Sequence, residues 1–325
     1  TAPARVGSTM SPSQTLPPPQ PAKTHPLDEN YSFLSIKYHE SVPFVTVVAL
    51  NRPKKRNAIN AQMWKEIGDA FASIGTTGDG CRCVLLTGSG KGFCGGIDTT
   101  DEKFFSGLAV NVDDDDDDDD ATTSKDTARK SIAFLPQILQ MQAAFTAVEQ
   151  CPVPVVAAIH GACVGAGVDL VCCADVRVCS SDAIFSIREV RLGLAADVGT
   201  LQRFPKLVGF GSRVRELCLT ADDFGAEDAF KIGFVSRISN NETGDLIDVA
   251  NDICRRISRN SPVAVTVTKA SLNYSRDHTV AEGLGHVALQ NSSSLMSEDL
   301  VKSFMMSRGG GADVQFAPMP SHSRL

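Results

Sequence analysis

Hydrophobic residues follow two different spacings along this chain, and the change of spacing predicts its secondary structure. Short runs rich in Val, Ile, Phe and Tyr are typical of β-strands, and two of them open the ordered part of the sequence, at residues 33–38 and 44–50. Met63, Ile67 and Phe71 then recur at every fourth position, which predicts a helix over 61–74 with one buried face.

Two further strands, at 83–87 and 155–160, are apolar throughout, and each is followed by a glycine-rich segment. Additional strands are expected at 176–179 and 183–187. Helices are expected at 128–149, 201–208, 212–219, 226–232, 245–259, 263–274, 280–290 and 298–306. Strands that alternate with helices predict an α/β fold with a helical C-terminal portion.

Changes of composition divide the chain into segments. Proline, serine and threonine dominate the start and predict a disordered leader, while eight consecutive aspartates at 113–120 predict a solvated loop, since like charges repel. The expected limits are 1–28 for the leader, 29–260 for the core with an acidic insertion at about 108–126, 261–308 for the helical region and 309–325 for a flexible tail.

Charge and hydropathy exclude several classes of function. The net charge is −7, but it becomes +1 without the eight aspartates, so the folded part lacks the broad basic face that nucleic-acid binding needs. No uninterrupted apolar run approaches the roughly 20 residues of a spanning helix, so no membrane span is expected. The ten cysteines stand mostly in apolar context without C-x-x-C spacing, which predicts buried free thiols and no metal site.

The glycine-rich segments do not match nucleotide-binding motifs. A Walker loop needs Ser or Thr after its lysine, but Gly92 follows Lys91, and neither segment has Rossmann spacing. Two turns remain, at Gly95-Gly96-Ile97 and Gly165-Ala166-Gly167. Their N–H groups can converge as an oxyanion hole, which stabilises charge developing on a carbonyl oxygen; the alternative is that these glycines only serve tight turns and helix packing.

Three acidic residues stand in surroundings rich in Val, Leu and Ala: Asp169, Glu189 and Asp197. Desolvation raises the pKa of a carboxyl group toward the range that suits proton transfer. Taken one at a time, each could equally be a helix cap or an ion-pair partner.

Together these segments carry a family resemblance over residues 44–275. The chain resembles the enoyl-CoA hydratase/isomerase (crotonase) superfamily in its stretches Leu50-Asn51-Arg52-Pro53, Gly92-Phe93-Cys94-Gly95-Gly96-Ile97-Asp98, residues 154–170 and Gly199-Thr200-Leu201-Gln202-Arg203. Within that superfamily, Asp197 and Ser275-Arg276-Asp277-His278 resemble the Δ3,5-Δ2,4-dienoyl-CoA isomerases.

The resemblance implies a spiral of repeated ββα units, with C-terminal helices that assemble a homotrimer or homohexamer. It places the two oxyanion N–H groups at Ile97 and Ala166. The residues it implies for substrate binding are Gly95, Gly96, Ile97, Asp98, Thr99 and Ala166.

The implied activity is conversion of 3,5-dienoyl-CoA to 2,4-dienoyl-CoA in fatty-acid β-oxidation. In it Asp197 takes a proton from C2, Glu189 delivers one to C6, and Asp169 supports both electrostatically. Alternatives are hydration of 2-enoyl-CoA, a Δ3 to Δ2 shift, and a non-catalytic protein of the same fold. No cofactor or metal is expected, because the acyl-CoA thioester is itself the substrate.

Two further expectations concern partners. A basic patch of Arg52, Lys54, Lys55 and Arg56 lies where the family holds the nucleotide end of coenzyme A, although solvated surface residues are an equal alternative. The final Ser323-Arg324-Leu325 is a variant of the S-K-L address for the peroxisomal import receptor, which predicts a peroxisome or a related organelle such as a glycosome, with the mitochondrion as the alternative.

Overall fold

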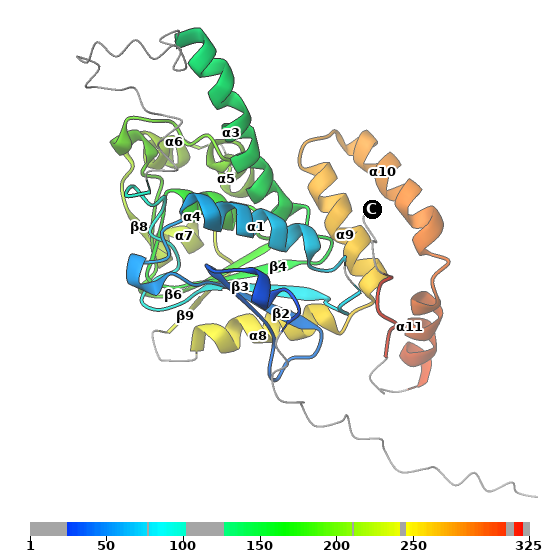
Figure 1. The fold of residues 1–325 in the computed structure, drawn as a ribbon. Helices are drawn as coiled ribbons and strands as arrows, with labels where there is room; N and C mark the ends of the chain where they lie inside the picture. Colours follow the sequence, from blue (N-terminus) through cyan, green and yellow to red (C-terminus); the bar gives the residue numbers. More distant parts are fainter. Residues whose placement is uncertain are drawn as a thin grey trace, which may run out of the picture.

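The computed structural model describes residues 25–76, 78–101, 127–209, 211–240, 245–309 and 315–320. At its centre is a six-stranded sheet of order β1-β2-β3-β4-β6-β9 (Figure 1). The strands span Leu34–Tyr38 (β1), Val45–Leu50 (β2), Cys83–Gly88 (β3), Val155–Ile159 (β4), Val176–Ser180 (β6) and Arg237–Ser239 (β9). The predictions for the leader up to residue 24, for the aspartate run and for the last five residues concern parts of the chain outside this description.

Strand pairing places the glycine-rich turns at one edge of the sheet. β1 and β2 pair antiparallel, whereas β2, β3, β4, β6 and β9 follow one another in parallel. Parallel strands end at the same edge, so the segments after β3 and β4 meet there. A second sheet of order β5-β7-β8 continues from this edge, built from Ala162–Val164 (β5), Ile184–Ser186 (β7) and Phe224–Gly225 (β8).

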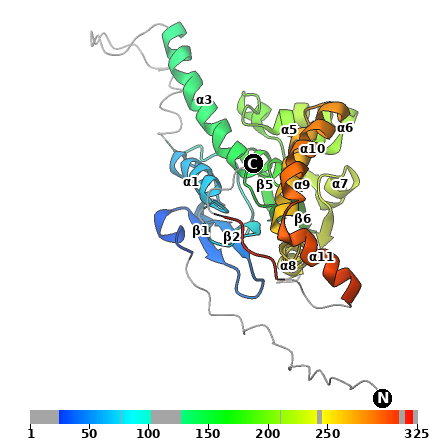
Figure 2. The ribbon, with the colours of Figure 1, turned by 90° about the vertical axis from the view of Figure 1, so that its right-hand side faces the viewer.

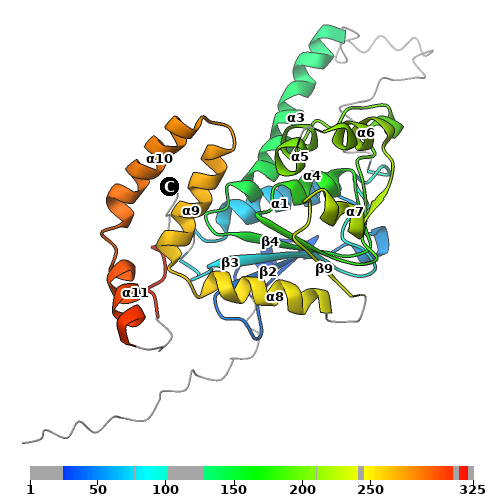
Figure 3. The same cartoon turned by 180° about the vertical axis from the view of Figure 1, so that it is seen from behind.

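Helices cover both faces of the central sheet. One face packs against α1 (Ala61–Ser73), α3 (Thr127–Glu149) and α4 (Ala166–Cys172), where Phe71, Phe93 and Phe145 are fully buried. The other face packs against α8 (Asp245–Ser258), which lies beneath the sheet in Figure 3. The remaining helices of this part are α5 (Thr200–Val208), α6 (Ser212–Thr220) and α7 (Ala226–Lys231).

Helix α3 is the longest helix among the described residues, and only part of it is covered. Its second half packs against α1 and buries Phe145 and Val148, while Ile132, Leu135 and Leu139 are exposed. By length and composition alone the stretch from Ser131 to Glu149 could cross a membrane. The sequence analysis expected no membrane span, because the chain has no long uninterrupted apolar run. A single such helix is weak support for a membrane span, because core helices of water-soluble proteins pass the same test.

Three C-terminal helices stand to one side of the core: α9 (Pro262–Ser275), α10 (Val280–Ser294) and α11 (Glu298–Gly309) (Figures 1 and 2). α10 returns along α9 so closely that a Cβ at Gly283 would lie 2.9 Å from the Ser275 hydroxyl oxygen. Large apolar side chains are exposed along them: Leu272, Val280, Leu284, Leu289, Leu295, Met296, Val301, Phe304 and Met305. This region therefore presents an apolar surface that the single chain does not cover.

The predicted α/β fold with a helical C-terminal portion is confirmed, and every predicted strand and helix is present within a few residues. The sequence analysis missed the short strands β5, β8 and β9, which have three residues or fewer and no readable periodicity. At the end of the predicted leader, His25 is buried and the Asp28 side chain accepts a hydrogen bond of 2.5 Å from the Ile36 N–H.

Candidate active site

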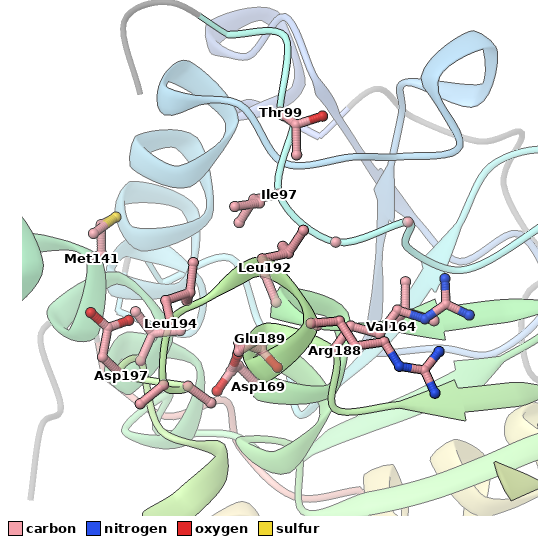
Figure 4. A pocket seen from close by; sticks show the side chains of 18 of the residues that line it. Ile97, Thr99, Met141, Val164, Asp169, Arg188, Glu189, Leu192, Leu194 and Asp197 are labelled. Carbon is pink, nitrogen blue, oxygen red and sulfur yellow. The ribbon is translucent and has the colours of Figure 1, made fainter. Parts of the chain in front are cut away.

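A cavity of about 550 Å³ lies at the edge of the sheet where the two glycine-rich turns meet (Figure 4). Its apolar wall consists of Trp64, Ile97, Phe134, Met141, Val164, Leu192, Leu194 and Val198. Asp169, Glu189 and Asp197 also line it. The structure therefore brings all three predicted acids and both predicted oxyanion positions into one cavity.

The first oxyanion position, Ile97, follows a turn that bridges to Ile59. The Ile59 N–H donates to the Gly96 carbonyl at 2.8 Å, and the Asp98 N–H donates to the Ile59 carbonyl at 2.9 Å. This parallel bridge uses the peptide groups on both sides of Ile97, so the Ile97 N–H points away from Ile59. Among the described residues it has no acceptor.

The second oxyanion position, Ala166, is the first residue of α4. Gly165 precedes it with a φ of +53°, and the Gly165 N–H donates to the Ser186 carbonyl at 2.9 Å. The Ala166 N–H belongs to the first turn, where a helix offers no acceptor, and it has none elsewhere in the described chain. A Cβ at Gly165 would lie 3.8 Å from the Gly96 Cα, so the two turns are in contact.

The small residues of this second turn are not interchangeable. A Cβ at Gly167 would lie 2.8 Å from the Cys94 Cβ, too close for any side chain, whereas the Ala166 methyl group lines the cavity. Glycine at 167 thus permits α4 to pack against the first turn, while alanine at 166 only adds apolar surface.

Asn57 fixes the first turn, and the sequence analysis did not single it out. Its buried side-chain amide donates to the carbonyls of Ser89, Gly92 and Phe93 at 2.8, 2.9 and 3.1 Å. Its Oδ1 accepts from the Arg52 N–H at 2.9 Å. Asn57 has a φ of +55°, a conformation that asparagine tolerates better than most residues. No local signal indicated this role, because Asn57 lies 32 to 36 positions before the three carbonyl groups that it binds.

Asp98, predicted to bind substrate, instead stabilises the first oxyanion turn from outside the cavity. Its carboxylate accepts from the Thr100 hydroxyl at 2.6 Å and pairs with the Arg52 guanidinium at 2.8 Å. These hydrogen bonds, that of Thr100 above all, lower the pKa of Asp98 to about 2. Asp98 does not line the cavity, whereas Gly95, Gly96, Ile97 and Thr99 do.

The ion pair with Asp98 separates Arg52 from the other three residues of the predicted basic patch. Arg52 is committed to Asp98, and its guanidinium also lies 5.0 Å from the centre of the Phe33 ring. Lys54, Lys55 and Arg56 are exposed, and the Lys55 Nζ donates to the Thr100 hydroxyl at 3.2 Å. Only these three remain available to an anionic ligand.

Asp169 is completely buried at the floor of the cavity. Its Oδ1 accepts from the Thr200 N–H at 2.6 Å, while its Oδ2 has no hydrogen-bond partner among the described residues. Burial first, and then the charge of Glu189, raise the pKa of Asp169 to about 7 against the opposing effect of the Thr200 hydrogen bond. This carboxyl group can therefore hold or release a proton near neutral pH.

Glu189 lies beside Asp169, at the start of the 3₁₀ helix η3 (Glu189–Leu192) (Figure 4). The residue is only 8% exposed, and its Oε2 has no hydrogen-bond partner in the described part of the chain. Its other oxygen would lie 3.3 Å from a Cβ at Gly165, which places this carboxyl group against the second oxyanion turn. Burial, with a smaller effect of Asp197, raises the pKa of Glu189.

Asp197 lies on the same wall near Met141 and Leu194, but its surroundings differ from the expectation (Figure 4). The sequence placed it in an apolar turn where an idle charge would be unfavourable, whereas the structure leaves the residue exposed. Its neighbours Ala196 and Val198 are the ones that are buried. Partial burial of the carboxyl group still raises the pKa of Asp197.

All ten cysteines are free thiols, and nine of them are buried. In the described part of the chain, no group of three or more His, Cys, Asp or Glu side chains is placed to hold a metal ion. The cavity offers two N–H groups without an acceptor among the described residues and three carboxyl groups. Arg188 and Arg191 also line it, and each is paired with an aspartate, Asp223 and Asp222 respectively.

Comparison with known proteins extends this description. The sequence model of the enoyl-CoA hydratase/isomerase family matches residues 41–105 and 129–308. The chain is 43% identical over 274 residues to the human mitochondrial Delta(3,5)-Delta(2,4)-dienoyl-CoA isomerase, covering 84% of this chain and 79% of that protein. It is 40% identical over 283 residues to the peroxisomal enzyme of the same name from Arabidopsis thaliana, covering 86% and 96%.

A solved structure agrees with the fold. The crystal structure of a putative enoyl-CoA hydratase from Streptomyces coelicolor A3(2) matches with a TM-score of 0.73 and 27% identity, over 94% of this chain and 99% of that one. The predicted crotonase fold is thereby confirmed. The family match, the two relatives and the cavity agree: the chain belongs to the enoyl-CoA hydratase/isomerase family.

Proposed function

We propose that this protein isomerises 3,5-dienoyl-CoA to 2,4-dienoyl-CoA. The observation that carries the proposal is the position of a third carboxyl group, Asp197, on the cavity wall beside Asp169 and Glu189. Two separated acid–base groups suit a reaction that removes a proton at C2 and adds one at C6. The names of the human and Arabidopsis relatives support the same activity.

In the proposed reaction, Asp197 removes a proton from C2 of the acyl chain. The electron pair of that C–H bond spreads over the conjugated carbons and the thioester oxygen as a dienolate. The N–H groups of Ile97 and Ala166 donate to this oxygen; in other enzymes the loss of one such donor lowers the rate by about 10²–10³. Glu189 then gives its proton to C6, which leaves the double bonds at C2 and C4.

The electrostatics of the wall suit these roles. Glu189 must carry a proton at the start of the reaction, and its raised pKa favours that state. Asp169 contributes a third carboxyl group, whose own pKa is raised by burial and then by the charge of Glu189. Proton transfer alone completes the reaction, so the proposal includes no redox or metal cofactor.

Hydration of 2-enoyl-CoA is the second candidate. Asp169 and Glu189 stand together at the floor of the cavity, and two carboxyl groups can activate and orient a water molecule. A Δ3 to Δ2 shift or a non-catalytic role would also leave Asp197 without a task. The acid at position 197 therefore decides between these alternatives.

The direct test is incubation of the purified protein with 3,5-dienoyl-CoA while the ultraviolet band of the 2,4-conjugated product is followed. We expect rapid appearance of that band and much slower hydration of 2-enoyl-CoA in a parallel assay. Fast hydration without isomerisation would replace the proposal by the hydratase alternative. Binding of both thioesters without turnover would indicate a non-catalytic protein.

We also propose that α9, α10 and α11 assemble the protein into a homotrimer or homohexamer. Their exposed apolar side chains, Leu284, Leu289 and Phe304 among them, form a larger uncovered surface than scattered single residues would. Native mass spectrometry should detect the oligomer, and Leu284→Asp should weaken it. A monomer of the wild-type protein at micromolar concentration would contradict this assembly.

For localisation, both organelles named in the relatives remain candidates. We propose the peroxisome or a related organelle, through binding of Ser323-Arg324-Leu325 to the import receptor. These residues lie outside the described part of the chain. Deleting them from a tagged protein should leave it in the cytosol. If import continues, the address lies elsewhere and the mitochondrion becomes the favoured site.

A further inference from the structure

A second cavity lies directly behind Asp197. It measures about 430 Å³, and Asp197 and Val198 line both it and the first cavity. Its other walls come from the second half of α3, from α5 and from the residues that follow α9. The Gln142 side-chain amide, on α3, donates a hydrogen bond of 2.6 Å to the Asp197 backbone carbonyl. This bond fixes the turn that lies between the first and the second cavity.

The walls of this second cavity suit water better than an acyl tail or an anion. Its three cations are already paired: Arg203 with Glu149 at 3.1 Å, Arg276 also with Glu149, and Lys206 with Asp277. Gln142, Thr146 and Gln202 add neutral polar groups. A polar space of this volume has room for roughly ten or more water molecules, at about 30 Å³ each in the liquid.

The other two carboxyl groups have no such outlet. Asp169 is fully buried and Glu189 is 8% exposed, and neither lines the second cavity. The three acids of one wall therefore differ in their access to solvent, although they face the same substrate space. Of the three acids, only Asp197 lines both the substrate space and the second, polar cavity.

This difference bears on a step that the proposed reaction requires. After each turnover Asp197 carries the proton from C2, and Glu189 has lost its own to C6. Both must be reset before the next substrate reacts. The proton can pass inside the protein from Asp197 to Glu189, or Asp197 can release it to water while Glu189 takes another from water once the product has left.

We infer that the second cavity is the proton exit of Asp197, so that the proton taken from C2 leaves to bulk water instead of passing internally to Glu189. The inference rests on the proposed isomerase function and adds to it the path by which the proton leaves Asp197. One O–H bond of Asp197 breaks, a water molecule in the second cavity accepts the proton, and the Asp197 carboxylate is restored.

The test uses substrate carrying deuterium at both C2 positions, converted in ordinary water over many turnovers. We expect the product to carry ordinary hydrogen at C6, because the abstracted deuterium is lost before Glu189 is reloaded. Deuterium at C6 of most product molecules would overturn the exit. If no 2,4-dienoyl product forms at all, the proposed function has failed instead, so the two failures are distinguishable.

The route itself is tested by filling the cavity. Gln202 lines it from α5, and Gln202→Phe should slow turnover and raise the deuterium content at C6, since Asp197 then stays protonated longer. Leu201→Phe is the matched control, because Leu201 is the preceding residue, is 39% exposed and lines neither cavity. A folded Gln202→Phe protein that behaves like Leu201→Phe would overturn the route.

Discussion

The two walls of the active-site cavity are built on opposite principles. On the donor wall, which carries the N–H groups of Ile97 and Ala166, the supporting polar groups are satisfied: Asn57 binds three carbonyls and Arg52 pairs with Asp98. On the acid wall, one carboxyl oxygen each of Asp169 and Glu189 has no hydrogen-bond partner within the described ranges of the chain.

The difference reflects what each wall must do. An oxyanion hole works because its donors are already in place when charge develops, so a network of backbone hydrogen bonds suits it. A proton-transfer group must change its protonation state, so spare hydrogen-bonding capacity and a raised pKa suit it. The following predictions test that contrast, in order of decreasing expected effect.

The acid wall should be the most sensitive to loss of proton exchange. Glu189→Gln and Asp197→Asn keep the shape of each side chain, and each should lower the rate of dienoyl isomerisation by about 10²-fold or more. The two decreases in rate should not be additive in free energy, because the reaction needs both groups and removing the second has little further effect once the first is lost. Steady-state rates of the single and double variants measure this, with Asp248→Asn on α8 as an exposed control. Near-full activity of Asp197→Asn would refute the isomerase proposal.

The donor wall should be sensitive to backbone geometry. Gly165→Ala puts a methyl group 3.3 Å from the Glu189 carboxyl group, at a φ of +53° that alanine disfavours. The Ala166 N–H should shift, and the turnover rate should fall by about 10²-fold, the low end of the effect of losing one donor. Gly211→Ala is the control, since Gly211 has a φ of −69° and no neighbour within 4 Å of its would-be Cβ. Equal activity of both variants would show that this turn is not a rigid donor.

Removing the support of the donor wall should act mainly on stability. Asn57→Ala leaves the carbonyls of Ser89, Gly92 and Phe93 without their donor, and the free energy of unfolding should fall by about 1–3 kcal/mol. Urea denaturation measures it. Asn273→Ala removes one amide hydrogen bond, to the Glu149 carbonyl at 3.0 Å, and should have a smaller effect. The same loss in both variants would contradict the role of Asn57 as the centre of this network.

The smallest effect at each step of pH should be a pH dependence of stability that comes from Asp169. Its pKa of about 7 lies above the ordinary 3.8, so the folded protein binds more protons than the unfolded chain between these values. Its contribution to stability is therefore complete below 3.8 and is lost as the pH rises toward 7, by at most about 1.4 kcal/mol per pH unit. Asp169→Asn should remove this slope from urea denaturation measured across the range. An unchanged slope would show that Asp169 is ionised throughout.

Local pattern was sufficient for much of the fold. Residues at helical or strand spacing, such as Met63, Ile67 and Phe71, report the face that must be buried, and this depends only on neighbours along the chain. The glycine-rich turns and the three acids also stood out, since glycine at a turn and carboxyl groups among apolar residues are visible without a structure. Very short strands such as β8 have too few residues to show any period.

What only the tertiary structure decided are the pairings between distant segments. Asp98, predicted to meet substrate, lies 46 positions from Arg52, and nothing local indicated that these two side chains pair. In the same way, the apolar residues around Asp197 suggested burial, but the chain turns so that Ala196 and Val198 are buried and Asp197 is exposed beside a second cavity. The sequence by itself determined which groups are available for chemistry. Which of them face the substrate, which hold the backbone and which reach water depends on contacts across the fold, because burial and hydrogen-bond partners are set by residues far apart in the chain.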